Sequence, residues 1–242
     1  MNSRTELTRA APRHAADGPR RKRRWLRWLA VGAAALLVLI VLAAWAFIKF
    51  QPTAAPLALP SGPASAPVGS LDGTWKVAAG SLAGFRVQES ALGLSNDAVG
   101  RTSAVTGSVV ISGDRFTSAA FRVDLAALTV NGKQQPQVAA SLHTGQYPGA
   151  TFTLAGPVAL GPALVAGGTI RLTVSGQLAM NGATHRVTAN VSARRDGATL
   201  QVAGSIPVAF SVWDIKEPGA FGFLGSLADH GTAEFLLTLR QP

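Results

Sequence analysis

The amino-acid sequence predicts an all-β domain whose antiparallel strands close into a barrel or a sandwich. Along residues 170–180 and 187–193, apolar residues, glycine and alanine alternate with mostly polar residues. This spacing sends the two sets to opposite faces of a strand. Between the two runs stands Asn181-Gly182, a pair that accepts the positive φ angles of a tight type I′ turn. We therefore expect the two runs to form a long β-hairpin.

The same alternation recurs from Leu71 onward. The residues expected to face inward on the other strands are Trp75, Val77, Phe85, Val87, Val105, Gly107, Val109, Ile111, Phe121, Val123, Leu125, Phe152, Leu154, Leu200, Val202, Gly204, Ile206, Val208, Phe210, Phe235, Leu237 and Leu239. Turn sequences such as Ser112-Gly113-Asp114 and Asp196-Gly197 separate the strands. Regularly spaced strands with tight turns are typical of an antiparallel meander.

One short helix is expected to interrupt the strands. Pro136 suits the first helical position and Gly145 suits the C-terminal cap. Between them, Val138, Ala139 and Leu142 can share one face. Such a helix would cross from one half of the meander to the other.

The positive charge of the chain is concentrated at its N-terminus. The formal net charge is +10, and residues 1–28 hold nine Lys and Arg against Glu6 and Asp17. The remaining chain is nearly neutral, which argues against a nucleic-acid partner. The sequence contains no cysteine, which excludes disulfides, thiolate nucleophiles and cysteine metal sites.

An uncharged segment at residues 29–48 predicts a transmembrane signal anchor. A helix of this length is about 30 Å long, which matches the hydrocarbon core of a bilayer. Interfacial aromatic residues flank it, namely Trp25, Trp28, Trp45 and Phe50. Residues 1–28 would form a basic, disordered tail in the cytoplasm by the positive-inside rule, which places the C-terminal domain outside the cytoplasmic membrane. A cleaved signal peptide is the alternative, although its apolar region is usually shorter.

Residues 49–70 are expected to form a linker rich in proline and alanine. Five prolines are spaced through it, which favours an extended, semi-rigid chain that could reach about 60 Å. The sequence does not decide whether the domain at residues 71–242 stands away from the membrane or lies back on it.

The order of short motifs along residues 72–240 resembles the YceI-like family, also called the polyisoprenoid-binding family. The matching residues are Trp75, Ser81, Phe85-Arg86-Val87, Gly100-Arg101-Thr102, Val105-Thr106-Gly107, Val123-Asp124-Leu125, Tyr147-Pro148, Thr151-Phe152 and, most specifically, the hairpin from Gly176 to Val187. The sequence departs from the family at Ala179, where threonine is usual, and at Lys133-Gln134-Gln135, where Arg-Asp is frequent. The resemblance implies an extended, lipocalin-like, eight-stranded up-and-down barrel that binds an isoprenoid-type lipid in its interior.

The ligand would then contact the inward-facing residues of the barrel. These candidate ligand-binding residues are Phe85, Val87, Val109, Phe121, Val123, Leu125, Phe152, Leu154, Ile170, Leu172, Val174, Leu178, Met180, Val187, Val191, Ile206, Val208, Phe210, Trp213, Phe221 and Phe223. Small inward-facing residues between larger ones, namely Gly107, Gly176, Ala189, Ala193 and Gly204, could leave a tunnel or accommodate neighbouring phenylalanine rings. Residues 217–227, rich in Phe and Gly, could form a plug at one barrel end or a lid.

The sequence predicts neither catalysis nor a cofactor. The histidines at 14, 143, 185 and 230 have no metal-ligand spacing, and no serine stands in a Gly-x-Ser-x-Gly motif. We therefore expect a non-enzymatic, membrane-anchored lipid carrier or sensor whose ligand is polyprenyl or quinone-like. A solid barrel that serves as an interaction module of the cell envelope is the alternative. The sequence leaves open whether the domain forms a homodimer.

Overall fold

The computed structural model describes residues 31–43, 53–91, 94–216 and 225–242, in two compact units, Met1–Gln51 and Pro52–Pro242. In the first unit, residues 31–43 form a helix whose residues are exposed. Within the described residues, no helix has both the length and the apolar character needed to cross a bilayer. The predicted tail at residues 1–28 and both ends of the predicted anchor lie outside the described residues.

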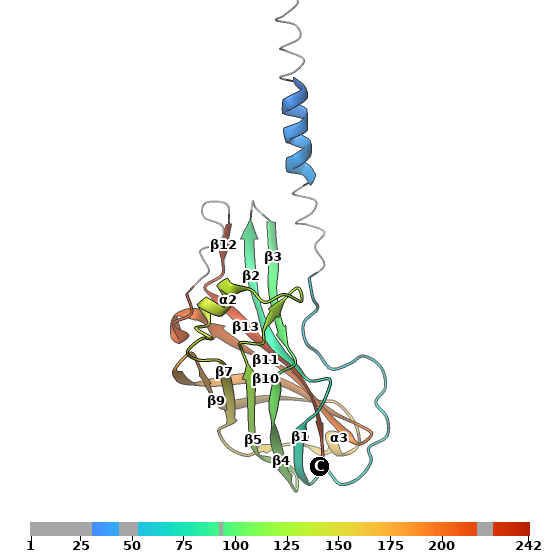
Figure 1. Ribbon diagram of the computed structural model, residues 1–242. Coiled ribbons are helices and arrows are strands. Elements are labelled where there is room, and N and C mark those ends of the chain that lie inside the picture. Colours follow the sequence, from blue (N-terminus) through green and yellow to red (C-terminus); the bar gives the residue numbers. More distant parts are fainter. Residues whose placement is uncertain (1–30, 44–52, 92–93, 217–224) are drawn as a thin grey trace, which may run out of the picture. The chain divides into compact units, whose positions relative to one another are not determined.

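The second unit is a closed barrel of eight antiparallel strands, which confirms the all-β barrel in the predicted fold class (Figure 1). In spatial order the strands are β1 (Gly73–Val77), β4 (Val105–Ser112), β5 (Arg115–Asp124), β7 (Gly149–Leu154), β9 (Ile170–Met180), β10 (Ala183–Asp196), β11 (Thr199–Ala209) and β13 (His230–Arg240). Pairing of β13 with β1, through Lys76 with Arg240 and Val77 with Leu239, closes the ring.

Further strands extend the barrel wall. The long β13 also pairs with β2 (Leu82–Ala91), which pairs with β3 (Leu94–Thr102) and β12 (Gly225–Leu227). Two short strands, β6 (Thr129–Val130) and β8 (Val158–Ala159), pair with β3 and β5. Helix α2 (Pro136–Ser141) and β12 lie near one end of the barrel, and β1, α3 (Pro162–Val165) and the C-terminus lie near the other (Figure 1). We call these the α2 end and the α3 end.

The expected hairpin is present and its turn has the expected geometry. Strands β9 and β10 pair from Met180 with Ala183 to Ile170 with Ala193. The turn residues Asn181 and Gly182 have φ angles of 52° and 77°, as a type I′ turn requires at both positions.

The helices differ in part from the prediction. Helix α2 begins at Pro136 as expected, but it ends at Ser141 with Leu142 as its C-cap, rather than at Gly145. Helix α3 and the 3₁₀ helix η1 (Phe210–Trp213) were not predicted. Phe210, which we expected to end a strand, begins η1. These helices have four residues each, which is too short for a hydrophobic period to appear.

The α3 end is filled by a dense apolar core. The largest side chains that are almost fully inaccessible to solvent all belong to it: Trp75, Ile111, Leu160, Leu164, Leu200 and Leu239. A second cluster, which includes Val87, Leu128 and Trp213, lies at the α2 end and contains none of these fully buried side chains. Side-chain packing therefore closes the α3 end.

Residues 53–70 have almost no regular secondary structure and belong to the same unit as the barrel. We call them the strap. The segment passes over the outside of the barrel and leads to β1 at the α3 end (Figure 1). It is hydrogen bonded to the barrel at both of its ends, for example from Leu57 to Glu234 and from Val68 to Gly197.

Candidate ligand-binding cavity

An apolar cavity of about 500 Å³ occupies the barrel interior. Residues from β2, β4, β5, β7, β9, β10, β11 and β13 line it. Sites for small ligands are typically 300–1,000 Å³ and mostly apolar. The volume and the composition of its wall therefore suit one small apolar or amphiphilic molecule.

Most of the predicted interior residues line this cavity. They are Phe85, Val87, Val109, Phe121, Val123, Leu125, Phe152, Leu154, Leu172, Val174, Leu178, Met180, Val191, Ile206, Val208 and Phe210. Period-2 alternation is sufficient to place these side chains inward, because each lies on, or directly follows, a regular strand.

Three predicted residues do not line the cavity, and two lie outside the described residues. Ile170 belongs to the packed core of the α3 end. Val187 packs against the second cluster, and Trp213 lies within it. The Trp213 and His185 rings are nearly perpendicular, with 4.8 Å between their centroids. These side chains pack against other apolar side chains rather than beside the cavity, which a strand pattern cannot reveal. Phe221 and Phe223 belong to the segment that the structure leaves undescribed.

Glycines in the wall lie beneath phenylalanine rings. A Cβ at Gly176 would come within 2.2 Å of the Phe152 ring, and one at Gly100 would come equally close to Phe85. Gly107 and Gly204 have the same relation to Phe121 and Phe235, their partners on the adjacent strand. The small residues thus accommodate aromatic rings, and a cavity remains between the rings.

A polar rim marks the α2 end of the cavity. Glu89, Gln135, Gln137 and Ser141 line the cavity, and the last three lie at the start of α2 or within it. Gln137 and Ser141 are four residues apart and so share one helix face. Burial raises the pKa of the Glu89 carboxyl. Thr232 and Glu234 of β13 also border the cavity, but the Glu234 carboxylate is bonded to Arg86 and Arg101.

Sequence reasoning missed this rim, although a signal for it was present. Glu89 follows Phe85 and Val87 at the same period of two, so the strand pattern alone would have aimed its side chain into the barrel. The glutamines and Ser141 could not be placed in this way, because α2 reaches the cavity only through the tertiary fold.

The hairpin turn fastens the elements around the rim. The Asn181 amide nitrogen donates to the carbonyl oxygen of Trp213 at 2.7 Å, and its amide oxygen accepts from His143 Nδ1 at 2.9 Å. His143 closely follows α2, and Trp213 ends η1. One buried side chain therefore ties β9, β10, η1 and the chain after α2 together.

Metal-ligating side chains do not gather among the described residues: no group of three or more His, Asp or Glu lies close enough there to hold a metal ion. His230 Nδ1 lies 2.7 Å from Asp229 Oδ1, but both side chains are exposed. The cavity lining contains no histidine.

Comparison with solved structures agrees with the fold. The structure of "a polyisoprenoid binding domain from Saccharophagus degradans implicated in plant cell wall breakdown" superimposes with a TM-score of 0.55 at 17% sequence identity, covering 70% of this chain and 98% of that one. The crystal structure of Burkholderia cenocepacia BcnA gives a TM-score of 0.50 at 21% identity, covering 64% and 95%. No curated protein matches this chain in sequence.

A family model matches most of the barrel directly in sequence. It is the model of the YceI-like domain, and it covers residues 75–238. The matched range runs from Trp75 in β1 to Thr238 in β13 and so includes every strand of the closed ring. This chain therefore belongs to the YceI-like domain family.

Proposed function

We propose that this protein binds one isoprenoid-type amphiphile, polyprenyl or quinone-like, inside its barrel and acts as a carrier or sensor of that lipid. The observation that carries the proposal is the apolar cavity of about 500 Å³ with polar side chains at its α2 end. A solid interaction module would have no need of such a cavity. Family membership and the similar polyisoprenoid binding domain support the same ligand class.

The arrangement of the cavity suits an amphiphile. The aromatic and aliphatic walls would hold the hydrocarbon chain, and Glu89, Gln135 and Gln137 could receive a polar head group at the rim. Burial of each methylene is worth about 0.8 kcal/mol relative to water. A lipid that comes from a bilayer leaves an apolar medium, however, so its net transfer free energy is small. Loading and release can therefore both proceed.

We further propose that residues 29–48 anchor the protein in the cytoplasmic membrane, with the N-terminus in the cytoplasm and the barrel outside. The absence of charge along this segment and the basic cluster at residues 20–24 support the anchor and its orientation. The described helix at residues 31–43, which has exposed apolar side chains, is compatible with it.

Two tryptophan substitutions on one strand test the ligand. Val191 lines the cavity, whereas Thr188, three residues earlier on β10, is exposed. Val191→Trp should fill part of the cavity and abolish uptake of a polyprenyl or quinone-like lipid. Thr188→Trp should bind like the wild type. Native mass spectrometry of the delipidated full chain after lipid addition measures both.

Failure of the wild-type protein to gain a lipid mass in this experiment would refute the proposal. Equal uptake by the two variants would show that the lipid binds elsewhere. Thermal unfolding of each variant without lipid controls for loss of fold, because overpacking a core typically costs about 1–3 kcal/mol.

A further inference from the structure

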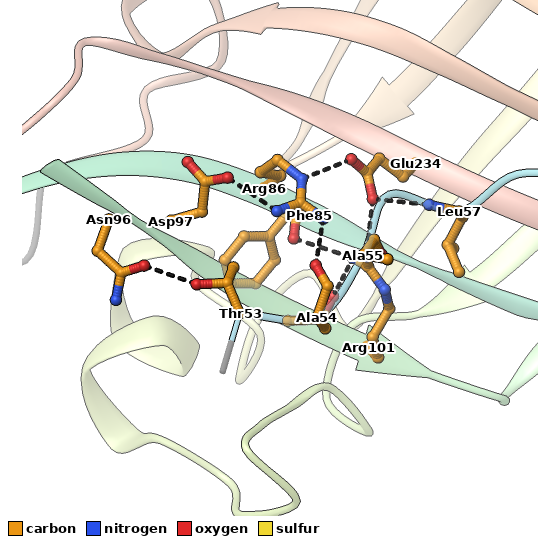
Figure 2. A network of polar contacts seen from close by, with 11 residues as sticks. Thr53, Ala54, Ala55, Leu57, Phe85, Arg86, Asn96, Asp97, Arg101 and Glu234 are labelled. Atoms are coloured by element: carbon orange, nitrogen blue, oxygen red, sulfur yellow. Dashed lines mark hydrogen bonds and ion pairs between the residues drawn. The ribbon is translucent and has the colours of Figure 1, made fainter. Parts of the chain in front are cut away.

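The first residues of the strap are bonded to β2 and β3. Thr53 Oγ1 donates to Asn96 Oδ1 at 2.6 Å, and Arg86 Nη2 donates to the Ala54 carbonyl at 2.7 Å. Arg101 Nη2 reaches the carbonyl of Ala55 at 3.4 Å. Figure 2 shows these contacts converging on the outer face of the barrel. The point at which the chain joins the barrel is therefore fixed at Thr53.

A compact ionic network supports this attachment (Figure 2). The buried Glu234 accepts from Arg86 Nε at 2.8 Å, pairs with Arg101 and also accepts from the backbone N–H of Leu57. Arg86 pairs with Asp97 at 2.8 Å as well. Arg86 and Arg101 thus pair with the carboxylates of Asp97 and Glu234. The strap carbonyls accept further hydrogen bonds from the two guanidinium groups. Hydrogen bonds that involve charged groups are roughly twice as strong as neutral ones.

The last residues of the strap are bonded to β10 and its turn. Ser65 N donates to Asp196 Oδ1 at 2.8 Å, and the backbones of Val68 and Gly197 are joined at 3.0 Å. Arg194 Nη1 donates to the Gly62 carbonyl at 3.0 Å, and the buried Arg195 donates to the Val68 and Gly69 carbonyls. This turn is at the opposite end of β10 from the hairpin turn, so the strap ends near the α3 end.

The strap changes the end of the barrel from which the chain departs. Without it, the chain would leave at Leu71, which is buried in the core of the α3 end. With it, the chain is bonded to the barrel from Thr53 onward, and the partner of Thr53, Asn96, pairs with Glu89 on β2. Glu89 is a rim residue of the cavity. The exit point is therefore at the α2 end, about one strand from the rim.

The remaining tether is short. The five residue steps from Ile48 to Thr53 span at most about 18 Å even when fully extended, whereas a free linker over residues 49–70 could reach about 60 Å. If residues 29–48 lie in a bilayer, the length of this tether limits the distance between Thr53 and that bilayer.

We propose that the strap presents the α2 end of the barrel to a lipid surface, so that the ligand passes between bilayer and cavity over a short path. The inference rests on the anchor and the lipid ligand of the proposed function. It adds that the α2 end is the end of the barrel that meets the membrane, and that the strap determines this orientation. An apolar chain that crossed water instead would lose about 0.8 kcal/mol for each exposed methylene.

Two single-cysteine variants of the full chain test this orientation, since the sequence contains no other cysteine. Val212→Cys is in η1 at the α2 end and Val165→Cys is in α3, and the native valines are similarly exposed, at 47% and 56%. The strands between them span about 28 Å along the barrel axis. With a fluorophore on each cysteine and a quencher on the lipid head groups of vesicles, we expect several-fold stronger quenching at position 212.

A matched variant isolates the tether. About 20 Gly and Ser residues inserted after Gln51 add about 25 Å of mean reach and leave the strap and the barrel unchanged. We expect the difference between positions 212 and 165 to collapse in this variant. Replacing residues 53–68 by Gly and Ser at equal length should also abolish it, with circular dichroism to confirm that the barrel is folded.

Equal quenching at the two positions, or stronger quenching at 165, in protein that remains with the vesicles after an alkaline wash would overturn the proposal. If the wash removes the protein, residues 29–48 do not anchor it in the bilayer, and the proposed orientation is then wrong as well. Lipid uptake is measured separately by mass spectrometry, so failure of the ligand assignment is distinguishable from both outcomes.

Discussion

Asn181 combines a backbone role with a side-chain role. Its φ of 52° suits the type I′ turn, and its buried amide holds Trp213 and His143. Asparagine tolerates the left-handed conformation better than most residues. Glycine would satisfy the turn as well, but it could not make these side-chain hydrogen bonds.

Asn181→Ala should therefore cost about 3 kcal/mol of unfolding free energy, from about 1 kcal/mol of left-handed strain and about 1 kcal/mol for each lost hydrogen bond. Asn131 is the matched control, because it has the same φ of 52° but is exposed. Asn131→Ala should cost only about 1 kcal/mol. Urea unfolding measures both, and equal losses would show that the Asn181 side chain contributes nothing.

The strap is an element without regular secondary structure whose order depends on the barrel. Its N–H and C=O groups find partners in Glu234, Arg86, Arg194 and Arg195 rather than in a neighbouring strand. Among these, Glu234 contacts both the barrel and the strap. It pairs with Arg86 and Arg101 of the barrel and accepts a hydrogen bond from the Leu57 N–H of the strap.

Glu234→Gln removes the charge that Arg86 and Arg101 share. We expect a loss of about 3 kcal/mol, the lower end for breaking a buried ion pair, because both arginines keep some exposure. Asp114→Asn makes the same change in the exposed pair with Arg115 and should cost less than about 0.5 kcal/mol. Chemical denaturation compares the two, and faster hydrogen exchange at Leu57 in Glu234→Gln would locate the effect in the strap. A loss as small as that of Asp114→Asn would contradict this role.

At the scale of the whole barrel, the two ends differ in packing. The α3 end holds the fully buried Leu160 and Leu164, whereas none of the residues of α2 at the other end is buried. The cavity borders the packed core on one side and the polar rim on the other.

Two leucine truncations measure this difference in packing. Leu164→Ala at the α3 end should cost about 3 kcal/mol, because a fully buried side chain leaves a void in close packing. Leu142→Ala lies beside the cavity and is only partly buried, so it should cost about 1 kcal/mol. Thermal unfolding of the delipidated protein tests this, and similar losses at the two ends would show that both are packed alike.

The strands could be predicted because each carries its own pattern. Alternation over residues 170–180 and the Asn181-Gly182 turn are local signals. The same alternation on the other strands predicted the interior residues from Phe85 to Phe210. Ile170 and Trp213, which we also expected in the cavity wall, do not line the cavity because they pack within the two apolar clusters. The prediction missed β3, α3 and η1 as separate elements, since tertiary contacts stabilise short or weakly patterned segments.

The sequence by itself determined the strands, the hairpin and its turn, the apolar wall and the family, because strand periodicity and turn chemistry act over a few residues. Only the tertiary structure decided that phenylalanine rings fill the space above the glycines while a cavity of about 500 Å³ remains. It alone gathered Glu89 and α2 into a rim and bonded the proline-rich segment to the barrel. These features depend on residues distant in sequence, such as Leu57 and Glu234, which no local pattern connects.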